Sequence, residues 1–501
     1  MSLRRVPECV ETNQVTQTSS AMPNRRQCLA GAAALALTTV VRPAAGTPTS
    51  SARIDLDAGK TKLSMLGAKW PRTDVWAYNG QIPGPLIRLR QHERLRIRVA
   101  NRLDEETTVH WHGLRIPNAM DGVPHLTQKP IAPGQDFHYD FMVPDAGTYW
   151  YHPHQRSFEQ VGRGLYGALI VDEAEPIRVD RELIWTLDDW RLTKTGQISD
   201  NFGHQHDAAH GGRLGNAVTV NGRLAGDVAL RRGERIRLRL INAANARIFG
   251  LEFQNHRPIV IALDGQPVEP HAPDGDLVVL GPAMRADLIL DASASNGRRF
   301  AVTDRFYNGL EYKLLDLVYD SDPLRQDVPD WPMDLPANPL PEPDLTTAER
   351  HEIMFQGGMM GGMVMRDMDI RVKPDQMQAM QRMMHDGKVW FVNGIAAEGH
   401  VMDPMLTLQR GRSYLLAMTN ATAWHHPIHL HGHSFRVIAR NGTPTRRREW
   451  QDTVLMAPRE KVEIAFVADN PGDWMFHCHI LEHQAGGMMG VIRVGNERRR
   501  T

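Results

Sequence analysis

Near its C-terminus the chain reads His477-Cys478-His479-Ile480-Leu481-Glu482-His483-Gln484-Ala485-Gly486-Gly487-Met488. Side chains alternate between the two faces of an extended strand, so His477 and His479 point one way and Cys478 the other. The thiolate, a histidine five residues on and a methionine ten residues on can converge with one more histidine. This is the ligand set of a blue, electron-transferring copper site. The flanking histidines face a second metal centre, so Cys478 lies on a short covalent route between the two.

Histidine pairs of the form His-x-His recur along the chain and support this interpretation. Random placement of the 23 histidines would give roughly one such pair. Histidines scattered near a buried cysteine are therefore the weaker explanation. The pairs that we assign to metal binding are His110/His112, His152/His154, His429/His431 and His477/His479.

The composition limits the other classes of function. The chain has 501 residues, room for about three domains. Its net charge is zero, so we expect no nucleic-acid partner and no attraction to an anionic membrane. Of its three cysteines, Cys9 and Cys28 lie in a predicted leader. Cys478 then stands alone in the mature chain, which excludes a disulfide framework.

We interpret residues 1–46 as a leader. Arg25-Arg26 is followed by an apolar, alanine-rich run over residues 28–41, and small residues follow that run. This pattern resembles a twin-arginine export signal. The run is too short to span a bilayer. The sequence therefore predicts export to the bacterial periplasm, with no membrane anchor once the leader is removed.

The rest of the chain contains an internal repeat. Asn-Gly pairs precede alternating apolar stretches in three places, and an asparagine closes each stretch at similar spacing. Residues 132–154 align without a gap to residues 457–479. Many short strands with turn signals predict an all-β fold of three Greek-key β-sandwiches. The Asn-Gly pairs begin at Asn79, Asn221 and Asn393, and the closing residues are Asn101, Asn242 and Asn420.

The expected domains are 47–174, 175–320 and 348–501, and a proline-rich linker at 321–347 joins the last two. The first and third repeats each contribute two His-x-His pairs, so eight histidines can meet across one interface. The middle repeat has no matching pair and is interpreted as a spacer. We expect the mature protein to be a monomer.

The motifs HWHG, HPH, HPIHLHGH and HCHILEHQAGGMM, in this order and spacing, resemble those of the multicopper oxidases. The likeness covers essentially the whole mature chain and implies three cupredoxin-like domains with four copper ions. It implies a type 1 copper on His426, Cys478, His483 and Met488. It also implies a type 2 copper on His110 and His429, and a type 3 pair held by His112, His152 and His479 and by His154, His431 and His477.

The resemblance further implies single-electron oxidation of a reductant at type 1, and transfer through Cys478 to His477 and His479. Dioxygen is then reduced to water at the other three coppers. Asp121 matches an acidic residue that relatives use near the cluster; the alternative is a simple turn carboxylate. Many bacterial relatives carry a Glu where Gln484 stands. Turnover is then slower, or another acid supplies protons, with Glu482 and Asp452 as candidates.

Ten methionines between residues 354 and 384 suggest the substrate. Thioethers select Cu(I), and the segment resembles the Met-rich insert of bacterial copper-efflux oxidases. A flexible packing lid is the alternative. Part of the segment, 374–384, is a candidate helix with methionines on one face. The candidate ligands for an additional, labile substrate copper are Met354, Met359, Met360, Met363, Met365, Met368 and Asp367.

One departure weakens the copper-efflux comparison. Those oxidases carry an Asp and a Met where this chain has Thr422 and Trp424. Trp424 is interpreted as packing beside the copper or, alternatively, as an aromatic platform for phenols. His204-Gln205-His206 with His210 is interpreted as a solvated loop rather than a metal site.

Three hypotheses follow. The first is a periplasmic oxidase of Cu(I), with phenols as side substrates, that serves copper tolerance. The second is a laccase-type oxidase of organic reductants, which Trp424 favours. The third is a copper-sequestering protein, which would not need a trinuclear centre.

Overall fold

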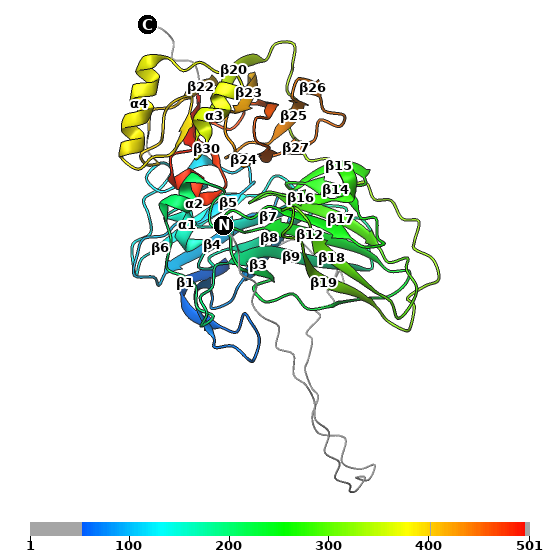
Figure 1. Cartoon of the computed structure of the whole chain (residues 1–501). Coiled ribbons are helices and arrows are strands. Elements are labelled where there is room, and N and C mark those ends of the chain that lie inside the picture. Colours follow the sequence, from blue (N-terminus) through cyan, green and yellow to red (C-terminus); the bar gives the residue numbers. More distant parts are fainter. Residues whose placement is uncertain (1–52, 401, 496–501) are drawn as a thin grey trace, which may run out of the picture. The chain divides into compact units, whose positions relative to one another are not determined.

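Three two-sheet β-sandwiches follow one another along the chain (Figure 1). The computed structural model describes residues 53–400 and 402–495, so the predicted leader lies outside the described residues. Domain 1 consists of sheets ordered β2-β1-β4-β6 and β3-β8-β7-β5. Its elements are β1 (Arg53–Leu63), β2 (Thr73–Tyr78), β3 (Gly84–Arg90), β4 (Arg94–Asn101), β5 (His110–His112), η1 (Asn118–Met120), β6 (Asp136–Met142), β7 (Gly147–His152), α1 (Ser157–Gln160) and β8 (Gly167–Asp172).

Domain 2 consists of sheets ordered β10-β9-β12-β17-β14-β15 and β11-β19-β18-β13-β16. Its elements are β9 (Arg181–Trp190), α2 (Gln205–Ala209), β10 (Ala217–Val220), β11 (Val228–Leu230), β12 (Arg235–Asn242), β13 (Phe249–Phe253), β14 (Ile259–Leu263), β15 (Gln266–His271), η2 (Asp274–Asp276), β16 (Val278–Leu280), β17 (Arg285–Asp291), β18 (Arg299–Asp304) and β19 (Tyr312–Tyr319).

Domain 3 consists of a sheet ordered β21-β20-β23-β29-β25-β26, with β27 paired to β25, and a sheet ordered β22-β31-β30-β24-β28. The all-β class predicted from the sequence is confirmed. The elements are β20 (Glu349–Gly357), α3 (Gly361–Asp367), α4 (Pro374–His385), β21 (Trp390–Val392), β22 (Leu406–Gln409), β23 (Ser413–Asn420), β24 (His426–Leu430), β25 (Phe435–Arg440), β26 (Thr443–Pro444), β27 (Trp450–Gln451), β28 (Thr453–Met456), β29 (Lys461–Val467), β30 (Gly472–Cys478), α5 (Leu481–Ala485) and β31 (Met489–Gly495).

The internal repeat has the same local geometry in all three domains. Asn79, Asn221 and Asn393 have positive φ angles of 53°, 53° and 51°. Asparagine tolerates this left-handed conformation better than most residues. The Oδ1 atom of each accepts a backbone N–H bond from the first strand of its own domain. That first strand pairs in parallel with a later strand in every domain, as β1–β4, β9–β12 and β20–β23.

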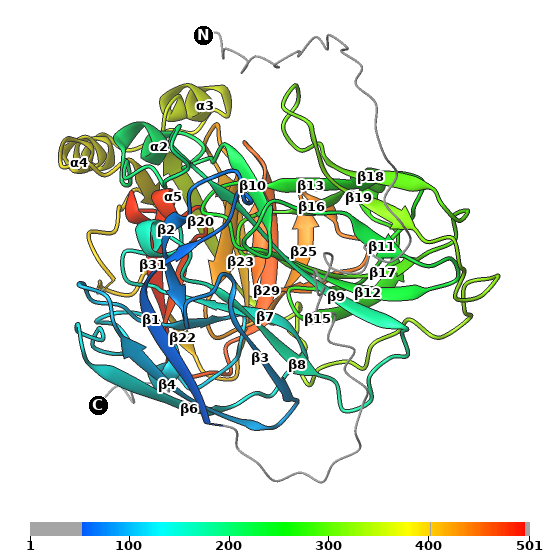
Figure 2. The same ribbon diagram turned by 90° about the horizontal axis from the view of Figure 1, so that it is seen from below.

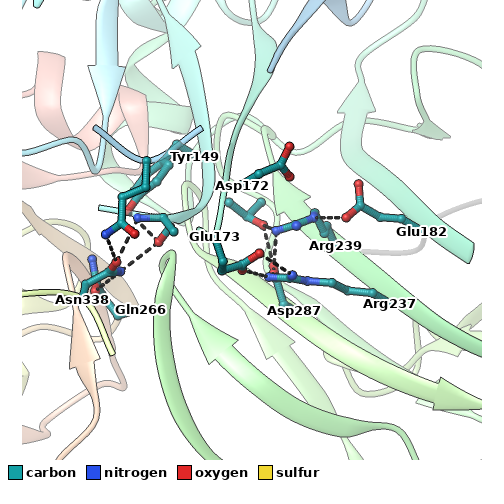
Figure 3. A network of polar contacts seen from close by, with 12 residues as sticks. Tyr149, Asp172, Glu173, Glu182, Arg237, Arg239, Gln266, Asp287 and Asn338 are labelled. Atoms are coloured by element: carbon teal, nitrogen blue, oxygen red, sulfur yellow. Dashed lines mark hydrogen bonds and ion pairs between the residues drawn. The ribbon is translucent and has the colours of Figure 1, made fainter. Parts of the chain in front are cut away.

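A buried ionic network joins domains 1 and 2 (Figure 3). Arg237 and Arg239 lie on β12 and are 3% and 1% exposed. Both bind Asp287 on β17, and Arg237 also binds Glu173, which directly follows β8. Thr148 on β7 donates to Asp287 and accepts from Arg239. Buried charges cost free energy to desolvate unless they are fully paired, so this network specifies how the two domains meet.

The proline-rich linker at 321–347 has neither helix nor strand and is hydrogen-bonded to domains 1 and 2. Asn338 exchanges two hydrogen bonds with the backbone of Ala146 in domain 1, at 2.9 and 2.8 Å. It also donates to Gln266 of domain 2 at 2.8 Å (Figure 3). Within the described residues, no helix is both long and apolar enough to cross a membrane.

Candidate metal centre

Three side chains of domain 3 converge on one buried point. His426 begins β24, Cys478 ends β30, and His483 lies on α5. Cys478 Sγ is 3.5 Å from His426 Nδ1 and 3.7 Å from His483 Nδ1, and the two nitrogens are 3.1 Å apart. Ligand atoms of one ion, each about 2.0–2.3 Å from the metal, lie roughly 3–4 Å apart. The triad therefore fits a single metal ion.

The other ring nitrogens show which atoms are free to bind. His483 Nε2 donates to the main-chain oxygen of His210 at 2.6 Å, and His426 Nε2 lies 2.8 Å from the Thr422 hydroxyl. Burial lowers the pKa of His483 to about 3 and that of His426 well below its ordinary value, so both rings are neutral. Burial raises the pKa of the Cys478 thiol, which a bound metal would deprotonate.

The backbone of Met488 is hydrogen-bonded to two residues of the triad. Its N–H donates to the carbonyl of His483 at 3.0 Å, and its carbonyl accepts from the N–H of Cys478 at 3.1 Å. The residue is fully buried. The backbone of Met488 is thus bonded to Cys478 and His483 of the triad.

Eight histidines from domains 1 and 3 form a second cluster. In domain 1, β5 pairs with β7 so that His110 lies opposite His152. In domain 3, β24 pairs with β30 so that His429 lies opposite His477. The ligand atoms fall into overlapping groups, each within 4.8 Å: His110/His112/His429, His112/His152/His479 and His154/His431/His477.

The cluster leaves several buried ring nitrogens without a partner. His479 has two such atoms, and His431 Nε2 lies only 3.1 Å from His477 Nε2. Unpaired buried polar atoms are costly. Burial also lowers the pKa of most of these rings, which keeps them neutral and able to bind a cation. The remaining unpartnered atoms are Nε2 of His110, His152 and His429 and Nδ1 of His112.

Two aspartates, one in domain 1 and one in domain 3, each contact cluster histidines of both domains. The main-chain oxygen of Asp121 accepts from His110 of its own domain at 2.8 Å, and its carboxylate accepts from His431 of domain 3 at 2.8 Å. The main-chain oxygen of Asp452 accepts from His429 of its own domain at 2.8 Å. Its carboxylate lies 3.2 Å from His112 Nε2 of domain 1. Such partners orient histidine ligands toward a metal.

Comparison with known proteins agrees with this geometry. Family models described as multicopper oxidase match residues 58–176, 181–320 and 369–498. Multicopper oxidase MmcO of Mycobacterium tuberculosis is 32% identical, over 86% of each chain. The chain belongs to the multicopper oxidases. It is therefore an oxygen-reducing oxidase with copper as cofactor, and the three cupredoxin-like domains are confirmed.

Other relatives carry different names. The crystal structure of a multicopper oxidase from Pseudomonas thermotolerans is 35% identical, with a TM-score of 0.77, and covers 89% of this chain and 100% of that one. Laccase-1 of Fomitopsis schrenkii is 30% identical, over 87% of this chain and 86% of its own. Copper resistance protein A of Escherichia coli is 26% identical, over 88% and 92%.

Asp452 and Asp264, two acids near the histidine cluster of this multicopper oxidase, have pKa values shifted in opposite directions. Burial alone would raise the pKa of Asp452, but the Arg285 guanidinium, at 2.6 and 2.9 Å, lowers it below the ordinary value. The ionised form of Asp452 is therefore favoured, and it can accept a hydrogen bond from His112. Burial and the charge of Asp452 raise the pKa of the neighbouring Asp264.

Gln484 and Glu482 on α5 face different partners. Gln484 Nε2 is 3.5 Å from both ring nitrogens of His154, and its Oε1 accepts from Ser157 at 3.1 Å. Glu482 accepts from Asn245 and from the N–H of Arg213, both in domain 2. Gln484 thus lies beside the cluster, whereas both oxygens of Glu482 are engaged in the contact with domain 2.

The methionine segment divides into buried and exposed members. Met354 lies within β20, so it belongs to the sheet rather than to the insert. Met365 is buried, and Asp367 pairs with Arg459 at 2.7 Å. Met368 is half-buried. The predicted helix at 374–384 is α4, whereas α3 was not anticipated from the sequence. The exposed members are Met359, Met360, Met363, Met377 and Met384.

Several residues around the triad were not found from the sequence. The Trp390 ring lies 5.0 Å from the His426 ring and 4.3 Å from that of His483, between centroids. The His210 carbonyl reaches His483 from domain 2. His400 lies 5.4 Å from His154. No local pattern marks these residues, because each reaches the site only through tertiary packing.

Proposed function

We propose that this enzyme oxidises Cu(I), with phenols as side substrates, and serves periplasmic copper tolerance after export by the twin-arginine pathway. In this proposal His426, Cys478, His483 and Met488 hold a type 1 copper. A type 2 copper binds His110 and His429, and a type 3 pair binds His112, His152 and His479 and His154, His431 and His477. The bound coppers supply one-electron redox chemistry and the reduction of dioxygen.

The protein groups position and insulate these sites. Burial excludes water from both histidine clusters and keeps their rings neutral. Cys478 joins His477 and His479 by main-chain bonds, and the carbonyl of Cys478 accepts from His477 Nδ1 at 2.9 Å. Asp121 holds the ring of His431. Four Cu(I) ions would be oxidised for each dioxygen converted to two waters, with four protons taken up.

One observation carries the choice of Cu(I) as reductant. Met359 is 50% exposed, and its N–H donates to the carbonyl of Ala209 at 2.7 Å. The next carbonyl along the chain, that of His210, binds His483 of the triad. Exposed thioethers therefore begin next to the predicted electron entry. Farther along, a cavity of about 250 Å³ between α3 and α4 is lined by Met365 and Met377.

Replacing the exposed thioethers tests this proposal. Leucine at 359, 360, 363, 377 and 384 nearly conserves side-chain volume, so folding should be retained. Oxygen uptake with Cu(I) should fall while phenol oxidation persists. Leucine at the buried position Met380 is the matched control. Unchanged Cu(I) oxidation in the five-fold variant would contradict the role of the segment.

A laccase-type oxidase is the second candidate, supported by the similarity to Laccase-1. Trp424 is half-buried, donates to the Met359 carbonyl at 3.3 Å and packs edge-on to His210 at 5.4 Å. Packing beside the copper thus describes Trp424 better than an open phenol platform does. Phenol turnover without added copper, together with poor Cu(I) oxidation, would favour the laccase. No oxygen uptake with either reductant would favour sequestration.

A further inference from the structure

Arg285 of domain 2 lies where all three domains meet. It begins β17, which packs against β7 of domain 1 (Figures 1 and 2), and its side chain is fully buried. Its Nε donates to the carbonyl of Thr148 in domain 1 at 3.1 Å, and the Tyr149 ring centroid lies 5.8 Å from its guanidinium carbon. Its terminal nitrogens bind both carboxylate oxygens of Asp452 in domain 3, at 2.9 and 2.6 Å. One side chain of the middle domain therefore contacts both of the other domains.

A second residue of domain 2 holds the same segment of domain 3 by its backbone. Asp264, which is also buried, accepts from the N–H of Thr453 at 3.0 Å and from that of Asp452 at 3.3 Å. Its other carboxylate oxygen accepts from the N–H of Arg285 at 2.9 Å. A bidentate arginine fixes the orientation of the carboxylate that it binds. Domain 2 thus holds Asp452 at both its main chain and its side chain.

Asp452 in turn determines which ring nitrogen is free in two histidines of the cluster. Its main-chain oxygen accepts from Nδ1 of His429, whose Nε2 is buried without a hydrogen-bond partner among the described residues. Its carboxylate lies 3.2 Å from Nε2 of His112, whose Nδ1 is likewise buried and unpartnered in the described ranges. The hydrogen bond that one ring nitrogen donates leaves the lone pair of the other available to a metal. The two unpartnered nitrogens are therefore the atoms available to copper.

The corresponding aspartate of domain 1 differs. Asp121 contacts His110 and His431, but one of its carboxylate oxygens is buried without a hydrogen-bond partner in the described part of the chain. Domain 2 therefore supports the cluster from one side, through Asp452. The interpretation of the middle repeat as a spacer did not include this contact, because its sequence carries no histidine pair.

We propose that Arg285 is a positioning residue for the oxygen-reducing centre, because it holds the Asp452 carboxylate in the orientation that leaves Nδ1 of His112 free for copper. This rests on the copper ligands of the proposed function and adds a residue of domain 2 to their surroundings. Histidine ligands depend on such outer partners, and loss of one commonly weakens metal binding by about 10–100-fold. No electron or proton passes through Arg285 in this role.

Arg285→Met tests this role in the copper-loaded enzyme. During dialysis against a copper chelator, copper other than type 1 should be lost at a chelator concentration about 10–100-fold lower than in the unaltered enzyme. The electron paramagnetic resonance signal of the type 2 copper should change or disappear with it. The blue absorption should remain, because Thr422 and His210 contact the type 1 histidines.

Two further variants separate positioning from stability. Arg237→Met removes a similarly buried arginine that binds Glu173 and Asp287 between domains 1 and 2, so it should lower stability without loss of copper. Adding Asp452→Asn to Arg285→Met leaves no unpaired charge and should restore part of the stability. An amide accepts a weaker hydrogen bond than a carboxylate does, so most of the loss in copper binding should remain in this double variant.

The outcomes distinguish the positioning role from the proposed function. Full copper binding with an unchanged type 2 signal in Arg285→Met or in the double variant would overturn the positioning role. Equal copper loss in Arg237→Met would also overturn it, because a general loosening of the domains would then explain the effect. An unaltered enzyme that is blue but binds no further copper would instead overturn the copper sites of the proposed function.

Discussion

Domains 1 and 3 place nearly the same strand against the histidine cluster, but they differ behind it. His152 donates to the carbonyl of Pro153 at 3.0 Å, just as His477 donates to that of Cys478 at 2.9 Å. Proline in domain 1 stands where domain 3 has the thiol. One face of the strand therefore carries half of the histidine cluster in each domain, and the other face carries a further candidate metal ligand, Cys478, in domain 3 alone.

The position corresponding to His426 shows the same contrast. His426 lies three residues before His429, and the residue three before His110 in domain 1 is Thr107. The Thr107 hydroxyl donates to Gln160 at 2.7 Å, so a neutral hydrogen bond occupies this part of domain 1. Domain 3 therefore differs from domain 1 at a few residues on one face of the strand, whereas the face that carries the histidine pair is nearly the same in both domains.

The largest effect is expected where the two strands differ. Cys478→Ser removes the thiolate, so the blue absorption should vanish. Oxygen uptake should fall by more than the roughly 100-fold that loss of an outer partner of a metal site costs. Pro153→Ala should keep the blue absorption, because no type 1 ligand lies in domain 1. Visible spectra and oxygen-electrode rates measure both. A Cys478→Ser protein that stayed blue would refute the ligand assignment.

The second-largest effect is expected at Asp121 and Asp452, which should differ in how much unfolding free energy is lost when their contacts are removed. Arg285→Met leaves the Asp452 charge buried and unpaired, which should cost about 3–5 kcal/mol in unfolding free energy. Adding Asp452→Asn to the Arg285→Met variant should restore part of the lost unfolding free energy, because it removes the unpaired buried charge. Asp121→Ala removes the acceptor of the His431 hydrogen bond without leaving a buried charge and should cost about 1–3 kcal/mol. Denaturant titration of the copper-free chain would measure all three. Equal losses of unfolding free energy in the Arg285 variant and the Asp121 variant would contradict this difference between the two aspartates.

Acid should weaken domain 3 before domain 1. Burial lowers the pKa of six histidines of domain 3 in the two sites and of three in domain 1. The unfolded chain then binds more protons below about pH 6.5. Stability present above that pH is lost as pH falls toward the folded pKa, about 3 for His483. Each histidine contributes up to about 1.4 kcal/mol per pH unit.

Hydrogen exchange of the copper-free chain between pH 7 and pH 4 measures this order. Peptides from domain 3 should lose protection first. Loss beginning in domain 1 would contradict the prediction.

The smallest change is expected at Gln484. Gln484→Glu places a carboxylic acid beside His154 and should raise turnover by a few-fold, well below the roughly 100-fold or more that a full general acid contributes. Steady-state rates with saturating reductant at several pH values test this, and the blue spectrum serves as a control for copper loading. An unchanged rate would mean that proton delivery through α5 does not limit turnover.

Much of the architecture was predictable because it depends on local pattern. The repeated Asn-Gly turns and alternating strands indicated the all-β class, which is confirmed. The spacing of Cys478 and His483 predicted that their side chains approach each other, because it depends on one strand and the short helix that follows. The membership of Met354 in β20 was not predictable from its neighbours. A strand ending inside a methionine-rich run has no local signal of its own.

The sequence by itself determined which residues are candidate copper ligands, since the ligand types and their strand spacing are local properties. Tertiary structure alone decided what surrounds them. Arg285 reaches Asp452, and His210 reaches His483, across domain interfaces that no sequence period records. The loop at residues 204–210 was interpreted as solvated because its composition is polar. Its carbonyls become anchors only when domain 3 supplies the donors. Contacts between distant surfaces depend on the shape of both, and a single segment encodes only one.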